Sequence, residues 1–345
     1  MKIANRKIND DNPVFIVAEL SANHNGSLDI AKKTIKAAKQ AGADAIKLQT
    51  YTPDTITIDC DNKYFQIKEG LWKGKTLYNL YKEAYTPWEW HKELFEVAHN
   101  EGLVCFSSPF DKTAIDLLES LNTPAYKIAS FEITDIPLIK IAASKGKPMI
   151  LSTGIATDKD IQLAIDTCKS VGNEQIVLLK CTSAYPAPIE EANLAMIPDL
   201  KKRFEVIPGL SDHTLGIVVP IMSVAFGAKV IEKHFILDKS IGGPDAAFSL
   251  DKDEFTQMVK AVREAEKAIG KIDYNLTEKQ KKGKQFTRSL YVVQDIKAGE
   301  RFTEDNIRSI RPGYGLHPKY YNEILGKKTS KDIERGTPLN WSLVN

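Results

Sequence analysis

The stretch that decides the fold begins Val206-Ile207-Pro208-Gly209-Leu210-Ser211-Asp212-His213, continues through a helical pattern at 217–227, and ends in Lys229-Val230-Ile231-Glu232-Lys233-His234. Both apolar runs are short and rich in β-branched residues, as strands buried in a parallel sheet are. The helical pattern between them is long enough to return the chain to the start of the next parallel strand. The stretch therefore predicts a β-α-β unit in which polar side chains follow the carboxyl end of each strand.

The same alternation of strand and helix recurs through the first two-thirds of the chain. Strands are predicted at 15–20, 45–49, 103–107, 125–129, 149–152, 176–180, 206–210 and 229–234. Helical patterns are predicted at 31–41, 88–100, 112–121, 136–144, 158–170, 217–227 and 253–269. This alternation is typical of a closed (β/α)8 TIM barrel, an α/β fold of about 250 residues, and we assign residues 1–270 to it as the catalytic domain.

Two further segments lie outside the repeating pattern. A long insertion at 51–87 follows the second strand, and we expect it to cover a substrate because catalysis takes place on that face of a barrel. Residues 271–288 contain a cluster of lysines with no acidic residue among them, which predicts a solvated linker. Short apolar runs separated by turn residues then indicate a small β-rich domain at 289–345.

Composition narrows the classes of partner. The 345 residues carry a formal net charge of +2, which argues against a nucleic-acid partner. The first residues show no apolar run of signal-peptide length, and no segment has the ~18 uninterrupted apolar residues of a membrane span. Cys105 and Cys181 lie in apolar runs and are interpreted as buried free thiols, which fits a reducing cytoplasm.

Polar side chains stand at the carboxyl end of every predicted barrel strand. They are Glu19, Lys47, Gln49, Ser107, Ser108, Lys127, Ser130, Glu132, Ser152, Thr153, Lys180, Ser183, Ser211, Asp212, His213, Glu232 and His234. These strand ends meet at one face of a barrel, where active sites lie. A buried polar group without a partner costs ~1–3 kcal/mol, so the set predicts either a shared polar ligand or pairs among the side chains themselves.

Part of this set is suited to an anion. Lys47 and Lys127 contribute positive charge, and nearby hydroxyl groups contribute hydrogen-bond donors for phosphate oxygens. The hydroxyl groups are those of Ser108, Ser130, Ser152 and Ser183. A single serine at such a position is more often a turn or cap residue, so the prediction rests on their convergence.

The two histidines at the ends of consecutive strands are candidate metal ligands. His213 and His234 can share one ion and leave positions open for water and substrate oxygen, although a single histidine is more often structural. Two imidazoles without a third strong ligand favour a loosely held Mn²⁺ or Mg²⁺ over a structural zinc. Glu232 shares a strand face with His234 and is predicted to orient that ring.

With these residues placed, the chain resembles the sialic acid synthase family over essentially its whole length. The matching motifs are Asn23-His24-Asn25-Gly26, Ile46-Lys47-Leu48-Gln49-Thr50, Phe106-Ser107-Ser108-Pro109, Tyr126-Lys127-Ile128, Leu151-Ser152-Thr153-Gly154, Gly209-Leu210-Ser211-Asp212-His213, Glu232-Lys233-His234 and Gly243-Pro244-Asp245. The tail, through Ala298-Gly299-Glu300 and Arg311-Pro312-Gly313, resembles the antifreeze-like (SAF) domain that ends these synthases.

The resemblance implies that phosphoenolpyruvate, an acetamido sugar aldehyde and water give a 2-keto nonulosonic acid and phosphate. It implies that phosphoenolpyruvate is held by Lys47, Ser108, Lys127, Ser130, Ser152, Ser183 and Ser211. The sugar hydroxyls would meet Glu19, Gln49, Tyr185 and Asp245. Glu132 would handle the attacking water, with Glu19 and Lys127 as further catalytic groups. His213 and His234 would bind Mn²⁺ or Mg²⁺, which polarises the aldehyde.

Departures from the family pattern bear on the acceptor sugar. Ala246-Ala247-Phe248 follow Asp245, where sialic acid synthases usually have a histidine, and Lys180 and Ser183 replace their usual histidine and asparagine. The chain is therefore closest to the branch that makes pseudaminic acid from 2,4-diacetamido-2,4,6-trideoxy-L-altrose. The alternative is synthesis of N-acetylneuraminic or legionaminic acid from another acetamido hexose.

The resemblance also implies how subunits assemble. Arg311 corresponds to an arginine that reaches the sugar N-acetyl group bound by the neighbouring subunit, which requires a domain-swapped homodimer. Two other classes remain as alternatives: an aldolase or lyase on a related barrel, and a tail that binds ice or carbohydrate. The tail lacks the regular threonine repeat of a flat ice-binding face.

Overall fold

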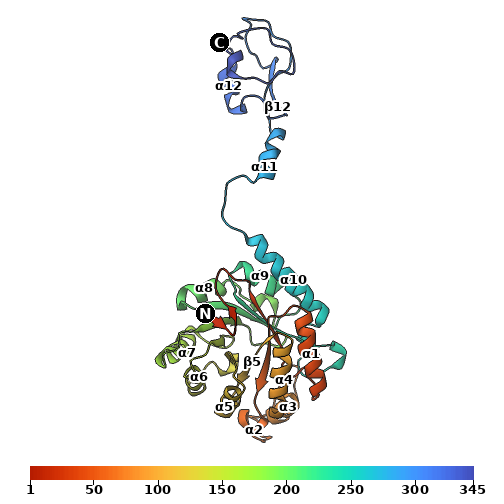
Figure 1. Cartoon of the computed structure of the whole chain (residues 1–345), viewed down its shortest axis with the longest axis vertical. Helices are drawn as coiled ribbons and strands as arrows, with labels where there is room; N and C mark the ends of the chain where they lie inside the picture. The colour runs from red at the N-terminus through yellow and green to blue at the C-terminus, as the bar shows by residue number, and fades with distance from the viewer. The chain divides into compact units, whose positions relative to one another are not determined.

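The computed structural model describes all residues from Met1 to Asn345, and the chain forms two compact units. The first unit is Met1–Gly270 and the second is Lys271–Asn345 (Figure 1). No helix combines the length and the apolarity that crossing a membrane requires.

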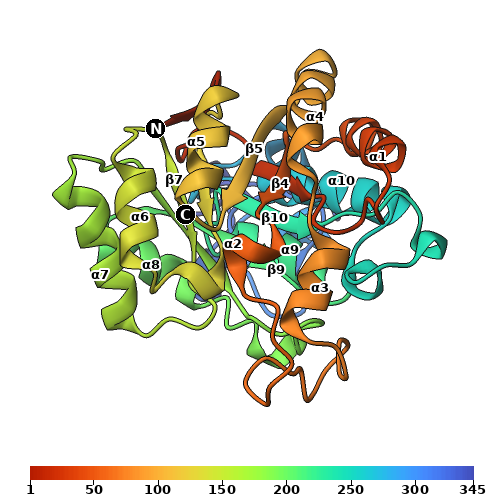
Figure 2. The same ribbon diagram turned by 90° about the horizontal axis from the view of Figure 1, so that it is seen from below.

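The first unit is a closed barrel of eight parallel strands. In order around the barrel they are β10 (Val230–His234), β3 (Phe15–Glu19), β4 (Ala45–Thr50), β5 (Val104–Pro109), β6 (Tyr126–Ile128), β7 (Met149–Ser152), β8 (Ile176–Cys181) and β9 (Ile207–Asp212). Figure 2 shows the strands at the centre with the helices around them. The predicted (β/α)8 barrel is confirmed.

Helices cover the outside of the barrel. They are α1 (Leu28–Gln40), α4 (Trp88–Asn100), α5 (Lys112–Ser120), α6 (Ile136–Ala143), α7 (Asp158–Ser170), α8 (Met196–Phe204), α9 (Val218–Ala225) and α10 (Lys252–Ile269). The sequence patterns missed α8, a nine-residue helix with Pro198 in its first turn. Its buried face is formed by Ile197, Leu200 and Phe204, a spacing that fits a helix packed on the barrel.

The two ends of the barrel differ in character. A two-stranded hairpin, β1 (Lys2–Ile3) with β2 (Arg6–Lys7), lies at the amino-terminal end, where Ile3 and Ile8 join the apolar interior cluster that contains Phe15 and Phe106. The interior at that end is therefore filled by apolar side chains. Polar residues occupy the opposite end, where the strands finish.

The insertion after β4 has structure of its own. It contains α2 (Pro53–Ile56), α3 (Leu77–Ala84) and an isolated antiparallel bridge between Gln66 and Thr76. Short 3-10 turns follow other strands, with bounds η1 (Ser130–Glu132), η2 (Ile189–Glu191), η3 (Lys239–Ile241) and η4 (Ala246–Phe248).

The second unit has a separate small core. Its elements are α11 (Glu278–Gly283), η5 (Lys284–Phe286), β11 (Ser289–Val292), β12 (Ile307–Ile310), η6 (Pro318–Tyr320), α12 (Tyr321–Ile324) and η7 (Trp341–Leu343). Antiparallel β11 and β12 pack Leu290, Val292 and Ile307 against Phe302 and Ile324. Every residue of α11 is exposed, so this helix contributes nothing to that core.

Candidate active site at the barrel mouth

Strand register brings the first three charged groups together. His234 pairs with Glu19 across β10 and β3, and Glu19 pairs with Lys47 across β3 and β4. The Lys47 ammonium lies 2.9 Å from Glu19 Oε2 and 2.7 Å from Glu232 Oε1. All these side chains are buried at the carboxyl end of the strands, as predicted for an active site of this fold.

Glu232 is the centre of this cluster. Besides Lys47, its Oε1 accepts a hydrogen bond from Ser211 at 3.2 Å and lies 3.5 Å from the Lys127 ammonium. Burial by itself would raise the pKa of Glu232, but the charges of Lys127 and Lys47 outweigh it and hold that pKa at about 2. The prediction that Glu232 orients His234 is wrong, because this carboxylate contacts the lysines instead.

Burial acts in the opposite direction on Lys47. Removal from water lowers the pKa of its ammonium to about 7, and the charge of Glu232 limits the fall. Removing one partner of a buried ion pair typically costs about 3–5 kcal/mol, because the remaining charge is left buried without compensation. Loss of Glu232 would leave the Lys47 ammonium in that position. The positive charge of Lys47 at neutral pH therefore depends on Glu232.

Serine hydroxyls line the site beside Lys127. Ser130 and Ser183 share a hydrogen bond of 2.7 Å between their Oγ atoms. The Oγ atoms of Ser108 and Ser152 are buried and have no hydrogen-bond partner. Because such groups cost free energy when left unsatisfied, the arrangement fits an anion whose oxygens complete their hydrogen bonds. The expected pairing among the side chains is found for Ser130 and Ser183, and the shared polar ligand stays a prediction.

Glu132 lies in η1, directly after β6. Its Oε2 atom is buried without a hydrogen-bond partner. Burial raises the pKa of Glu132 to about 7, although the positive charge of Lys127 opposes the rise. A carboxyl group poised near neutral pH can exchange a proton with water or substrate, which is the property of a general acid or base.

The two candidate metal ligands lie side by side. The ring centroids of His213 and His234 are 5.3 Å apart. His213 Nδ1 donates to the Thr182 carbonyl at 2.9 Å, which leaves Nε2 as the free nitrogen of that ring. His234 Nδ1 is buried without a hydrogen-bond partner, 3.9 Å from Asp245 Oδ2. The pair fits a divalent ion held by two imidazoles, and no cluster of three ligating side chains is formed.

The pKa values of the two imidazoles are shifted in opposite directions. Burial, followed by the nearby charge of His213, lowers the pKa of His234 well below its usual value. Burial also disfavours a charge on His213, but contacts with Cys181 and Thr182 outweigh it and raise the pKa of that ring. The lowered pKa of His234 favours the neutral ring that ligates a metal, whereas the raised pKa of His213 makes metal binding there compete more strongly with a proton.

A second polar group lies beside the histidines. Gln49 Nε2 donates to Glu19 Oε1 at 3.1 Å and to Ser21 Oγ at 2.9 Å, and Ser21 donates to Asp245 Oδ2 at 2.5 Å. Desolvation raises the pKa of the buried Asp245 carboxyl. This chain of hydrogen bonds leads from the lysine cluster to the loop after β10.

An aromatic surface adjoins these groups. The Tyr185 ring lies 4.4 Å from the His213 ring and 5.3 Å from the Phe248 ring, measured between centroids. Phe248 in turn lies 4.9 Å from the His234 ring. The site is therefore polar on the lysine side and apolar beside the histidines.

One predicted residue is not in the barrel. Every other candidate lies on a strand end or on the loop that follows it, whereas Arg311 follows β12 in the second unit, where it is exposed. Sequence reasoning missed Ser21, which links Gln49 to Asp245, and gave Glu232 the wrong partner. Ser21 had no usable signal, because the loop that carries it becomes informative only when Asp245, 224 residues away, is placed beside it.

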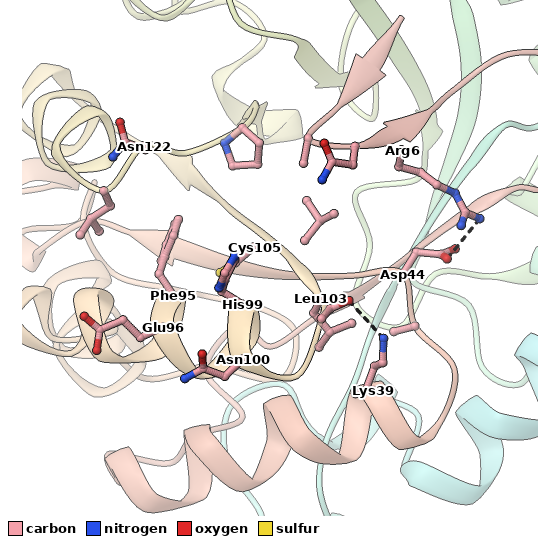
Figure 3. A pocket seen from close by; sticks show the side chains of 17 residues that line it. Arg6, Lys39, Asp44, Phe95, Glu96, His99, Asn100, Leu103, Cys105 and Asn122 are labelled. Atoms are coloured by element: carbon pink, nitrogen blue, oxygen red, sulfur yellow. Dashed lines mark hydrogen bonds and ion pairs between the residues drawn. The ribbon is translucent and has the colours of Figure 1, made fainter.

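A large cavity lies away from the barrel mouth. It has a volume of about 960 Å³ and opens at the amino-terminal end of the strands, among α1, α4 and the start of β5 (Figure 3). Arg6 at its edge is paired with Asp44 at 3.2 Å, and Lys39 donates to the Gly102 carbonyl at 3.1 Å. These two cationic groups are thus engaged with protein partners, and none of the candidate site residues lines the cavity. The buried charged and imidazole side chains, and not the size of a cavity, identify the barrel mouth as the candidate active site.

Comparison with known proteins agrees with this site and fold. The model of the NeuB family matches residues 34–274, and that of the SAF domain matches residues 287–345. The chain is 55% identical over 342 residues to the pseudaminic acid synthase of Campylobacter jejuni subsp. jejuni serotype O:23/36 (strain 81-176), with 99% of each covered. It is 52% identical to the pseudaminic acid synthase of Helicobacter pylori (strain ATCC 700392 / 26695), covering 95% of this chain and 97% of that one.

A solved structure shows the same architecture. The structure of the spore coat polysaccharide biosynthesis protein SpsE of Bacillus subtilis is 35% identical to this chain and has a TM-score of 0.68. The alignment covers 100% of this chain and 99% of that one. The fold and site define a barrel enzyme with a buried lysine–carboxylate cluster and a histidine pair at its mouth. The chain belongs to the NeuB family and carries a C-terminal SAF domain. The resemblance to sialic acid synthases is confirmed.

The serine pair gives a first prediction. A Cβ atom on Gly154 would lie 2.0 Å from Ser183 Oγ and 3.0 Å from Ser130 Cβ. We expect Gly154→Ala to displace Ser183 and to weaken phosphoenolpyruvate binding about tenfold, roughly 1.4 kcal/mol, measured by calorimetry. Gly283→Ala, where a Cβ meets nothing within 4 Å and φ is −66°, is the control for substitution itself. Unchanged affinity in Gly154→Ala would show that the serine pair does not contact the anion.

Proposed function

We propose that the chain is a pseudaminic acid synthase. It condenses phosphoenolpyruvate with 2,4-diacetamido-2,4,6-trideoxy-L-altrose and water, and releases pseudaminic acid and phosphate. The carrying observation is the mouth itself, where Lys47 and Lys127 lie around Glu232 and the buried hydroxyl groups of Ser108 and Ser152 have no hydrogen-bond partner. Identity of 55% to a pseudaminic acid synthase along the whole chain supports the choice of product.

The residues divide the work by chemistry. The lysines and serines hold the phosphate and carboxylate of phosphoenolpyruvate, so that its C3 atom faces the sugar aldehyde. A bond forms between C3 and the aldehyde carbon, and water adds at C2. Cleavage of the C2–O bond then releases phosphate and leaves a ketone. The sugar hydroxyls are placed by Glu19, Gln49, Tyr185 and Asp245.

Glu132 is the residue suited to take the proton of the attacking water. Its Oε2 atom has no protein partner, and burial raises its pKa to about 7. A base with that pKa is about half ionised at neutral pH and still accepts protons readily. Water exclusion by the insertion 51–87 would keep this proton transfer confined to the site.

We further propose that His213 and His234 hold Mn²⁺ or Mg²⁺. When bound, the ion would polarise the sugar aldehyde as a Lewis acid. Charge supports the proposal: Lys47 and Lys127 are matched by the carboxylates of Glu19 and Glu232. The cluster therefore has no surplus positive charge to balance a phosphate, and a divalent ion beside it would supply one.

The working assembly is proposed to be a domain-swapped homodimer. Arg311 is exposed in a unit whose core is separate from the barrel, which supports its acting on the sugar bound by a partner subunit. We assign the reaction to the cytoplasm, supported by three buried cysteines, Cys105, Cys168 and Cys181, that form no disulfide.

Turnover tests the substrate assignment directly. Purified protein is given phosphoenolpyruvate with the trideoxy altrose, with N-acetylmannosamine or with the legionaminic acid precursor, and products are identified by mass. We expect release of phosphate only with both substrates present, and efficient turnover of the trideoxy sugar alone. Equal turnover of N-acetylmannosamine would contradict the assignment. Phosphate release without any sugar would indicate a different reaction class.

The pKa of Glu132 predicts the pH profile. A base must be ionised, so kcat falls as pH decreases below about 7, the value to which burial raises this carboxyl. Glu132→Gln should lower kcat by about 100-fold or more and leave phosphoenolpyruvate binding intact. Glu190→Gln, an exposed carboxylate in η2, is the matched control. If the kcat of Glu132→Gln still fell below about pH 7, that fall would belong to another ionisable group.

Removal of one imidazole tests the metal. We expect His213→Ala and His234→Ala to bind Mn²⁺ at least ~10-fold more weakly than the parent, in calorimetric titrations of chelator-treated protein. Activity on add-back should fall in parallel. Circular dichroism controls for the fold, and His99→Ala, an exposed histidine of α4, controls for loss of any imidazole. Parental Mn²⁺ affinity in either variant would remove that histidine from the ligand set.

Mixed dimers test whether Arg311 acts between subunits. Arg311→Ala and Glu132→Gln are each expected to be inactive, because one lacks the guanidinium and the other the base. A heterodimer purified through two different tags contains one intact barrel opposite one intact Arg311. We expect it to recover up to about half of the parental activity. A heterodimer as inactive as its parents would place Arg311 on its own subunit or outside the site.

A further inference from the structure

The insertion after β4 carries a hairpin whose tip holds a tryptophan. Backbone hydrogen bonds from Ile67 N to Lys75 O and from Leu77 N to Phe65 O, both 2.9 Å, join its two sides. Trp72 lies at the turn between them. Leu71, its neighbour, is 51% exposed, so the turn presents one large side chain to solvent and leaves the other for contacts with the barrel.

Trp72 touches two different loops of the mouth. Its indole Nε1 donates a hydrogen bond of 3.1 Å to the Pro244 carbonyl, in the loop after β10. Its ring lies 5.8 Å from the Tyr185 ring, in the loop after β8. One side chain therefore connects the insertion to both loops that carry acceptor-side residues.

The residues that Trp72 contacts are themselves next to, or among, the residues proposed to bind the acceptor sugar. Pro244 precedes Asp245, the carboxylate that accepts from Ser21 and lies 3.9 Å from His234 Nδ1. Tyr185 in turn packs against His213 at 4.4 Å. The lysine cluster, by contrast, is held by Glu232 and does not contact Trp72. A change at the hairpin tip should therefore act on the acceptor half of the mouth.

The same side chain extends the apolar surface beside the histidines. Trp72, Tyr185 and Phe248 form a continuous series, because Tyr185 lies within 5.8 Å of the first and 5.3 Å of the third. Such a surface excludes water and favours an apolar group over a hydroxyl. It is suited to the methyl end of a deoxygenated sugar, since a hydroxyl placed there would lose its hydrogen bonds to water.

We propose that Trp72 is the specificity-determining and positioning residue for the acceptor sugar. It fixes the loops of Tyr185 and Asp245 over the acceptor through its hydrogen bond to Pro244. With Tyr185 and Phe248 it forms the wall against which the deoxygenated, methyl-bearing end of the sugar packs. The identity of that sugar rests on the proposed function, whereas the positioning role of Trp72 does not.

Separate kinetic constants for the two substrates test this role. Trp72→Ala removes both the ring and the N–H, and Trp72→Phe keeps a ring but removes the hydrogen bond. We expect KM for the sugar to rise about tenfold or more in Trp72→Ala and several-fold in Trp72→Phe. KM for phosphoenolpyruvate should stay within about twofold of the parent. Leu71→Ala, at the same turn but exposed, should leave both constants unchanged.

A second substrate probes the apolar wall. The parent should prefer the 6-deoxy sugar over its 6-hydroxy counterpart, 2,4-diacetamido-2,4-dideoxy-L-altrose, by about tenfold or more. Trp72→Ala should reduce that preference towards unity, whereas a merely structural loss would lower both rates equally. Trp72→Phe keeps the test valid if Trp72→Ala does not fold, because retention of the ring should preserve the preference.

The outcomes are distinguishable. A parallel rise of both KM values, or an unchanged sugar preference in Trp72→Ala, would overturn the role of Trp72. If the parent does not use the trideoxy sugar, the proposed function fails by itself. The KM comparison is then made with the acetamido sugar that the parent does accept, and an acceptor-specific effect there would still support the positioning role.

Discussion

The mouth of the barrel depends on one buried carboxylate. Glu232 lies between Lys47 and Lys127, and it accepts a hydrogen bond from Ser211. The charges of Lys127 and Lys47 lower its pKa, so Glu232 is ionised near neutral pH. Burial lowers the pKa of Lys47 to about 7 even with Glu232 beside it, so loss of this carboxylate would lower that pKa further. Glu232 therefore contributes both to the position and to the charge of Lys47.

The remaining features of the site follow from that constraint. With both lysines matched by carboxylates, binding of a phosphate requires donors and charge from elsewhere. The structure offers the donors, since the hydroxyls of Ser108 and Ser152 have no partners, and the divalent ion proposed at His213 and His234 would supply the charge. Glu132 remains outside the ion pairs, which leaves its carboxyl free to exchange a proton near neutral pH.

Sequence patterns predicted the barrel because strand and helix repeat at the scale of a single β-α unit. They also predicted which polar groups gather at the mouth, because the carboxyl ends of all the parallel strands meet at the same face of the barrel. They could not predict which side chains contact one another. Glu232 and His234 share a strand face, so orientation of the ring was expected, yet register across β9 and β10 sets Glu232 beside Ser211. The contact between Trp72 and Pro244 spans 172 residues, and no local pattern contains it.

Phosphoenolpyruvate binding to Glu232→Gln tests the central claim most directly. The variant makes the site formally more positive, so simple charge attraction predicts tighter binding. If Glu232 instead maintains Lys47 as a positioned ammonium, calorimetry at pH 6.5, where Lys47 with its pKa of about 7 is mostly protonated in the parent, should show affinity at least ~10-fold weaker than the parent, a loss of about 1.4 kcal/mol. Affinity should partly recover near pH 5.5 as Lys47 regains its proton. Equal or tighter binding at pH 6.5 would contradict the account.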